Sequence, residues 1–262
     1  MRCNQHLWFR LYPLLGITLL GLLGAVLVSP IPQDQAYHNF ADQRNILGVP
    51  NFWNVATNIP FVLVGIMGIR SLIQNSLPAL LPGIFHFYLV FFGGVSLVGL
   101  GSGYYHLWPS NETLVWDRLP MAITFMAFFA IVISEFISEK FGKWVFLPLL
   151  LLGAISVGYW NITELRGEGD LRPYALIQFL PMLLIPIILL SFTPRFSHIS
   201  LIWALLATYL FAKGAEMGDK SLYKILEGLS GHSIKHLFSA LGPYFFFLAL
   251  KKRGPFKRAD SH

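Results

Sequence analysis

Runs of about twenty mostly apolar residues recur along the whole chain, and this is the length of helix that crosses a hydrocarbon core. Eight such spans are expected, at 11–29, 53–74, 84–106, 118–137, 144–160, 173–192, 199–217 and 233–250. The pattern predicts an all-α fold: a polytopic transmembrane helix bundle with a seven-helix core and a further N-terminal transmembrane anchor.

The first span has an alternative interpretation as a secretory signal, because it follows the basic residues Arg2 and Arg10. Its apolar run is long, however, and the stretch from Leu27 to Pro30 is a poor cleavage sequence. No Gly/Ser-rich linker or internal repeat divides the rest of the chain. We therefore expect an N-terminal tail and first transmembrane helix over 1–30, one seven-helix domain over 31–250, and a basic tail over 251–262.

Composition agrees with a membrane protein, since 55% of the 262 residues are hydrophobic and only 12% are charged. The net charge of +6 does not indicate nucleic-acid binding, because the basic residues do not share one soluble face. They fall on one side of the alternating spans, and the positive-inside rule makes that side cytoplasmic, together with both termini; these residues are Arg2, Arg10, Arg70, Lys140, Lys143, Arg195 and the tail 251–258. The single cysteine, Cys3, excludes an intrachain disulfide.

Polar residues at the ends of three spans need an explanation, because ionisable groups are costly at membrane depth and usually face the bundle interior. Ser102 and His106 are four residues apart and share one helix face near the end of the third span. Asp117 follows after a short connection, and His232 and His236 form an i, i+4 pair where the last span begins. Alternating spans place all five at the outer end of the bundle, near the periplasmic, extracellular or lumenal face.

Three imidazoles suit zinc, which in catalytic sites commonly takes three protein ligands and leaves a fourth position to water. Zinc then lowers the pKa of that water towards neutrality and makes it a nucleophile. Two alternatives stay open: paired histidines on a helix often only hydrogen-bond to backbone, and Asp117 also suits pairing with Arg118 or capping its helix. The remaining histidines that we considered are expected to be polar groups in tails or at interfaces: His6, His86, His198 and His262.

A polar stripe lies at the outer end of the seventh span and consists of Lys213, Glu216, Asp219 and Lys220. Mutual ion pairing is one explanation of these charges. Recognition of a lipid headgroup is the alternative.

Taken together, these residues resemble the alkaline ceramidase family, within the seven-helix membrane hydrolases that also include adiponectin receptors and GPI-remodelling lipases. The shared pattern is S-x-x-x-H on one helix, an Asp on the next, and H-x-x-x-H on the last. Three stretches are similar to motifs of the ceramidase branch, and the similarity runs from about Tyr37 to the C-terminus: 52–58 (FWNVATN), 117–121 (DRLPM, compared with D-E-L-P-M) and 231–237 (GHSIKHL).

The resemblance implies a zinc ion held by His106, His232 and His236, and cleavage of the ceramide amide to a sphingoid base and a fatty acid. It also implies that Asp117 handles the protons of the reaction. Ser102 would donate a hydrogen bond to the oxyanion or to water.

Calcium is a second metal that the resemblance raises, because animal alkaline ceramidases carry an acidic calcium-binding segment before the F-W-N motif. Here that segment contains Asp42, and Asn51 stands where a glutamate is expected. A calcium ion takes six or more oxygens, and we find too few carboxylates for it. Asp42 and Asn51 are the weak candidates, and ordering or capping the loop is the better expectation for Asp42.

The leading hypothesis is a zinc-dependent intramembrane hydrolase that acts on the carbon–nitrogen bond of ceramide or a related N-acyl lipid taken from the bilayer. The alternative is an adiponectin-receptor-like regulator in which zinc is only structural. A metal transporter is a third class, but it needs carboxylates that lead to the inner face, and only Glu135 lies near that end.

Overall fold

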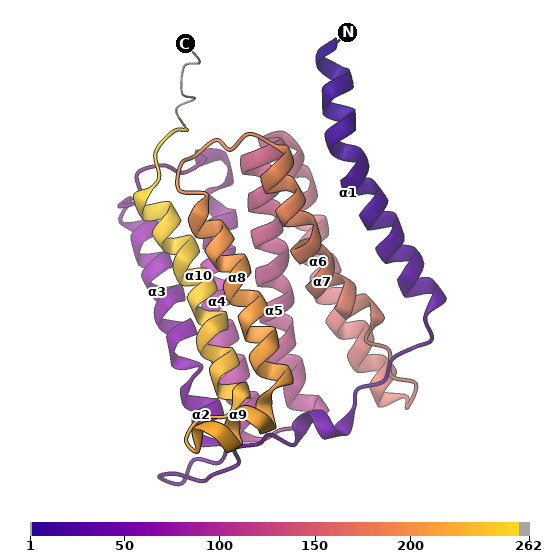
Figure 1. The fold of residues 1–262 in the computed structure, drawn as a ribbon, viewed down its shortest axis with the longest axis vertical. Coiled ribbons are helices and arrows are strands. Elements are labelled where there is room, and N and C mark those ends of the chain that lie inside the picture. Colours follow the sequence, from indigo (N-terminus) through magenta and orange to yellow (C-terminus); the bar gives the residue numbers. More distant parts are fainter. Residues whose placement is uncertain (1, 257–262) are drawn as a thin grey trace.

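The chain folds into a bundle of long α-helices (Figure 1). The computed structural model describes residues 2–256, and their side chains from residue 9 onward. Apart from isolated bridges, the regular structure of this described part is helical. The α-helices are α1 Arg2–Leu27, α2 Phe52–Ala56, α3 Ile59–Ile73, α4 Phe85–Leu107, α5 Asn111–Val132, α6 Glu139–Leu165, α7 Arg172–Ser191, α8 Ser200–Met217, α9 Asp219–Leu226 and α10 Gly231–Lys252. Three short turns accompany them: 3₁₀ turns η1 Gln35–His38 and η2 Pro82–Ile84, and the π-turn η3 Ile133–Ile137.

Length and hydropathy confirm a multi-pass membrane protein. Within the described residues, seven helical stretches are long and apolar enough to cross a membrane: Phe9–Leu27, Phe52–Ile73, Pro82–Leu107, Asn111–Ile137, Glu139–Leu165, Arg172–Ser191 and Gly231–Lys252. The remaining expected span, 199–217, is helix α8. It carries Lys213 and Glu216 in its last turns and is not among the helices that are long and apolar enough to cross a membrane. It nevertheless runs along the bundle against α10 (Figure 1).

The first helix stands apart from the others, as expected of an anchor. Only 6% of the residues in its most apolar stretch are buried, and the helix lies beside α7 at the edge of the bundle (Figure 1). The beginning of α1 and the end of α10 lie at the same end of the molecule. The side chains of Arg2, Cys3 and His6, and the end of the expected basic tail at 257–262, lie outside the described residues.

The second span is one apolar run in sequence but two helices in space. Helix α2 ends at Ala56, and α3 begins at Ile59 with Pro60 in its first turn, where a missing N–H costs no hydrogen bond. The side chains around this break are polar and buried: Asn54, Thr57 and Asn58. The break therefore brings hydrogen-bonding groups into the end of the bundle where α10 begins.

A buried ion pair closes the opposite end. Arg253 donates two hydrogen bonds to the two oxygens of Glu135, at 2.9 and 2.8 Å, and both side chains are 2% exposed. The Tyr88 hydroxyl donates to the same carboxylate at 2.6 Å. Glu135, the one residue that suggested an ion path, is therefore fully engaged with protein partners.

Candidate metal centre

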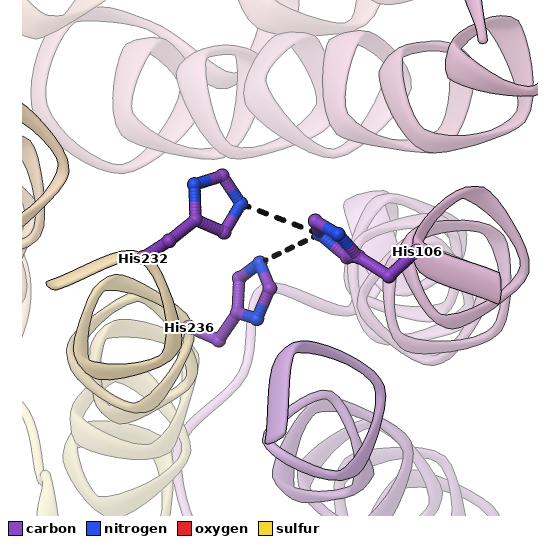
Figure 2. A group of neighbouring side chains, drawn as sticks. All are labelled: His106, His232 and His236. Atoms are coloured by element: carbon purple, nitrogen blue, oxygen red, sulfur yellow. Dashed lines mark hydrogen bonds between the residues drawn. The ribbon is translucent and has the colours of Figure 1, made fainter. Parts of the chain in front are cut away.

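Three buried imidazoles converge at one end of the bundle. His106 lies in the last turn of α4, while His232 and His236 lie in the first two turns of α10. Their side chains point towards one another from the two helices (Figure 2). The Nε2 atom of His106 lies 3.2 Å from that of His236 and 3.3 Å from that of His232, and the three ligand atoms all lie within 4.8 Å of one another. The structure thus brings together the three histidines that the sequence singled out.

Two of the three separations between these nitrogens match those around a tetrahedral metal ion. Zinc binds imidazole nitrogen at about 2.0–2.1 Å, so two such ligands on one tetrahedral ion lie roughly 3.3–3.4 Å apart. The separations of 3.2 and 3.3 Å are close to this value. The three histidines can therefore hold a metal ion, and their arrangement is compatible with zinc.

Thr57 fixes the orientation of the His236 ring. Its hydroxyl donates its only proton to the carbonyl oxygen of Trp53 at 2.6 Å. The hydroxyl oxygen, 3.0 Å from His236 Nδ1, therefore accepts the Nδ1 proton. This leaves the lone pair of His236 Nε2 facing the other two imidazoles.

Asp117 and Ser102 lie side by side next to the histidines. Both residues are buried, and both line one cavity. Helices α4 and α5 approach closely here, because Gly101 lies against the backbone carbonyl of Trp116 and has no space for a Cβ. This approach holds Ser102 beside Asp117.

The alternative roles for Asp117 do not match the structure. Ser110 caps α5, since its side chain accepts the backbone N–H of Thr113 in a capping box. Arg118 donates to Gln33 at 2.5 Å and stacks 4.2 Å from the Trp160 ring. In the described part of the chain, Asp117 forms no ion pair with Arg118.

The segment before α2 covers the histidines. The Phe40 ring lies 4.6 Å, between centroids, from the rings of both His106 and His232, and is 5% exposed. Asp219 holds this cover in place, because its carboxylate accepts the backbone N–H of Ala41 at 2.9 Å and that of His232 at 2.8 Å. A phenyl ring across two imidazoles keeps bulk water from that side of the site. Neither contact has a signature in the sequence.

The two weak calcium candidates have protein partners. The Arg44 side chain donates to both oxygens of Asp42, at 2.8 and 2.6 Å, and also to the carbonyl of Gly228 at 2.5 Å. Burial alone would raise the pKa of the Asp42 carboxyl, but the hydrogen bonds from Arg44 outweigh it and hold that pKa below its ordinary value. Asn51 donates to the carbonyl of His106 at 2.9 Å. These contacts support the loop-ordering role expected for Asp42.

A cavity of about 300 Å³ opens beside the histidines. Its polar end includes Ser102, Asp117 and His236. Apolar side chains from several helices line much of the rest of its wall, among them Phe61, Val95, Val98, Met121, Phe128 and Leu205. The cavity therefore brings Asp117, Ser102 and one imidazole of the histidine cluster to the edge of a space suited to an alkyl chain.

Lys235 is a further polar residue of this cavity, and the sequence motifs gave no indication of it. It lies between the two histidines of α10, and its Nζ atom is 3.1 Å from His232 Nε2 and 3.0 Å from Glu216 Oε1. Lys213 contacts the other oxygen of Glu216 at 2.8 Å. Ion pairing thus accounts for Lys213 and Glu216 of the polar stripe, whereas Asp219 binds backbone N–H groups.

Comparison with known proteins assigns the chain to a family. The family model described as Ceramidase matches residues 47–212, which is more than half of the chain and includes Ser102, His106 and Asp117. His232 and His236 lie beyond the matched residues. No match was found among curated proteins. With this match over most of the helical bundle, the chain belongs to the ceramidase family.

Proposed function

We propose that the protein is a zinc-dependent intramembrane hydrolase that cleaves the amide of ceramide or a related N-acyl lipid to a free amine and a fatty acid. The observation that carries this proposal is the cluster of three buried imidazoles, one of which, His236, lines a cavity together with Asp117 and many apolar side chains. Membership of the ceramidase family supports the same chemistry.

In this proposal His106, His232 and His236 hold the zinc ion. Zinc in such a site supplies Lewis-acid activation of water and of a carbonyl oxygen. Asp117 takes a proton from the attacking water and delivers it to the leaving amine, so that the elements of water are added across the C–N bond. Ser102, which lines the same cavity as Asp117, donates its proton towards the oxyanion that develops on the acyl carbonyl.

The acyl chain occupies the apolar part of the cavity. Burial of the chain there places its carbonyl at the polar end, beside Asp117 and His236. The Phe40 segment covers the histidines on the other side and limits the entry of water. The lipid reaches this site from the bilayer.

For the membrane topology we propose cytoplasmic termini and a metal site near the outer face, with the domain boundaries at 30 and 250. The distribution of basic residues supports this orientation. So does the position of the helix ends, because the start of α1 and the end of α10 lie together, opposite the histidines (Figure 1).

The buried carboxyl group of Asp117 beside the histidines favours a hydrolase over a regulator in which zinc has only a structural role. A structural zinc site is closed by its ligands and needs neither Asp117 nor a lipid-sized cavity. If metal removal unfolded the bundle while no lipid amide was ever hydrolysed, the regulator would be the better account.

The test combines metal analysis with lipid mass spectrometry. Purified protein is expected to contain about one zinc per chain and to release matched free amines and fatty acids from a mixture of ceramides and other N-acyl lipids. His106→Ala is expected to abolish both metal binding and turnover. His86→Ala is the matched control, because His86 lies at the other end of the same helix. Full hydrolysis by a His232→Ala/His236→Ala double variant would refute the mechanism.

A further inference from the structure

The polar end of the cavity carries more positive than negative charge. The charged side chains that line it are three cations, Arg118, Lys213 and Lys235, and two carboxylates, Asp117 and Glu216. A metal ion on the histidines adds further positive charge. In a low-dielectric surrounding, such an excess is costly unless an anion compensates it.

Glu216 is shared between two lysines and cannot neutralise both. Lys235 Nζ lies 3.0 Å from one of its oxygens, and Lys213 Nζ lies 2.8 Å from the other. The three side chains are 16%, 32% and 19% exposed for Lys235, Lys213 and Glu216 respectively. One ammonium group of this cluster therefore has no counter-charge within it.

Arg118 adds a second, buried cation with unused donor capacity. The residue is 7% exposed, and its guanidinium stacks on Trp160 and Tyr174 at 4.2 and 5.0 Å. One of its nitrogens donates to Gln33, but Nη1 has no hydrogen-bond partner among the described residues. The hydroxyl of Tyr209, another residue of the cavity wall, is also buried without a partner in that part of the chain. Buried donors of this kind normally find an acceptor.

From these observations we infer that the polar end of the cavity is an anion subsite, and that the substrates are N-acyl lipids with an acidic group on the amine side of the amide. The inference rests on the proposed amide hydrolysis and narrows its substrates from ceramide, which is neutral, to a related N-acyl lipid that is acidic. Lys235 sets the position of the acidic group, because its Nζ lies 3.1 Å from His232 Nε2 and so beside the reacting centre. A carboxylate, phosphate or sulfonate a few atoms from the scissile bond meets Lys235 and Lys213. A neutral polar group would leave the excess positive charge without a partner.

Two substrates that differ only in this charge provide the first test. N-dodecanoyl-serine carries a carboxylate where N-dodecanoyl-serinol carries a hydroxymethyl group. The kcat/KM of the zinc-loaded protein is expected to be at least about tenfold higher for the serine derivative. A preference for the serinol derivative would overturn the inference.

Variants that remove either a positive or a negative charge test whether Lys213, Glu216 and Lys235 cause the preference for the acidic substrate. Lys213→Gln is expected to lower the ratio of the two kcat/KM values, and Glu216→Gln is expected to raise it. Lys220→Gln is the matched control, because Lys220 belongs to the same polar stripe but does not line the cavity. Equal ratios in all three variants would show that the cluster does not select the substrate.

A binding experiment separates this inference from the proposed hydrolysis. The ligands are dodecyl phosphate and its neutral dimethyl ester, which contain no amide, and binding is followed by the shift in thermal unfolding. Dodecyl phosphate is expected to bind at least about tenfold more tightly, and Lys213→Gln is expected to reduce this difference.

The outcomes are distinct. Selective, Lys213-dependent binding of dodecyl phosphate without hydrolysis of any amide supports the anion subsite and refutes the proposed function. Hydrolysis of neutral amides together with equal binding of the two ligands refutes the anion subsite only. If neutral amides are preferred and dodecanoate inhibits in a Lys213-dependent way, the subsite binds the product carboxylate, and the assignment of the substrate class is wrong.

Discussion

At the scale of single residues, one hydrogen bond determines which nitrogen of His236 can bind a metal ion. Thr57 holds the proton of His236 on Nδ1, so replacing the hydroxyl by a methyl group releases both the ring and its tautomer. We expect Thr57→Val to raise the zinc dissociation constant by roughly ten- to a hundredfold. Competition with a chromophoric chelator measures this. Thr208→Val is the control, because Thr208 is similarly buried and its hydroxyl bonds only to the carbonyl of Leu205. Equal zinc affinity in both variants would contradict the role of Thr57.

Asp42 gives a pH-dependent prediction at the same scale. With Arg44 present, the pKa of the Asp42 carboxyl is lower in the folded than in the unfolded protein, so the pair stabilises the fold above about pH 4 and loses this effect as the pH falls further. In Arg44→Gln the buried carboxyl has no counter-charge, and burial then raises its pKa. The free energy of unfolding of this variant should therefore fall furthest below that of the natural chain at neutral pH.

Denaturant unfolding at several pH values tests how the stability difference between the variant and the natural chain depends on pH. The gap between Arg44→Gln and the natural chain should begin to narrow as the pH falls through the raised pKa of Asp42 in the variant. It should go on narrowing below about pH 4, until Asp42 is also protonated in the natural chain, where Arg44 holds its pKa below the ordinary value. Arg166→Gln, at an exposed position after α6, is the control. A gap that stays constant with pH would show that Arg44 acts through packing alone.

The sequence indicates some of these residues and not others, for a physical reason. Histidines and an aspartate inside apolar spans are conspicuous because burying them is costly, so His106, His236 and Asp117 were found from the pattern. Thr57 and Phe40 are ordinary in their local sequence. Their contacts with the histidines exist only after segments distant in the chain have packed together.

Between elements, one glycine controls how closely two helices approach. A Cβ on Gly101 would collide with the backbone carbonyl of Trp116, and a backbone cannot turn away as a flexible side chain can. Gly101→Ala is therefore expected to separate α4 from α5, to destabilise the fold by about 1–3 kcal/mol, and to move Ser102 away from Asp117. The thermal midpoint and the rate of amide hydrolysis should both fall.

Gly103→Ala is the matched control for this prediction. Gly103 lies two residues further along the same helix, and nothing within 4 Å would meet its new Cβ. Alanine also favours a helix over glycine, so this variant should be as stable as the natural chain or more so. Equal loss of stability in both variants would place the effect in the helix itself rather than in its contact with α5.

The elements were predicted well where apolar length alone determines them. Six spans coincide with long apolar helices, and the first is a helix that begins earlier than expected. The break between α2 and α3, the π-turn η3 and the short helix α9 were not predicted. A π-helical turn adds a residue without changing composition, and at the break Thr57 has a polar partner, His236, that comes from the distant helix α10.

At the scale of the whole molecule, helix α10 connects two buried polar clusters, the three histidines at its start and the Arg253–Glu135 pair at its end. Its first turns carry two of the three histidines, and Arg253 follows its last turn. The 22 residues of α10 correspond to roughly 33 Å at the rise of an α-helix. The histidine end gathers three imidazoles that can hold a metal ion, whereas at the other end Arg253 is paired with Glu135, which also accepts a hydrogen bond from Tyr88.

This separation predicts that the Arg253 cluster affects stability without changing the metal site. Arg253→Met leaves Glu135 buried without its partner, and the fold should lose about 3–5 kcal/mol. The double variant Arg253→Met/Glu135→Leu replaces the pair by apolar groups and should recover most of that loss. The unfolding midpoints of Arg253→Met, Glu135→Leu and the double variant measure the coupling energy between the two residues. Competition with a chelator, at temperatures well below these midpoints, measures the zinc affinity. Zinc affinity is expected to equal that of the natural chain throughout, because no contact of Arg253 reaches the histidines. A parallel loss of zinc affinity would instead mean that α10 transmits the disturbance along its length, so that the two ends act as one unit.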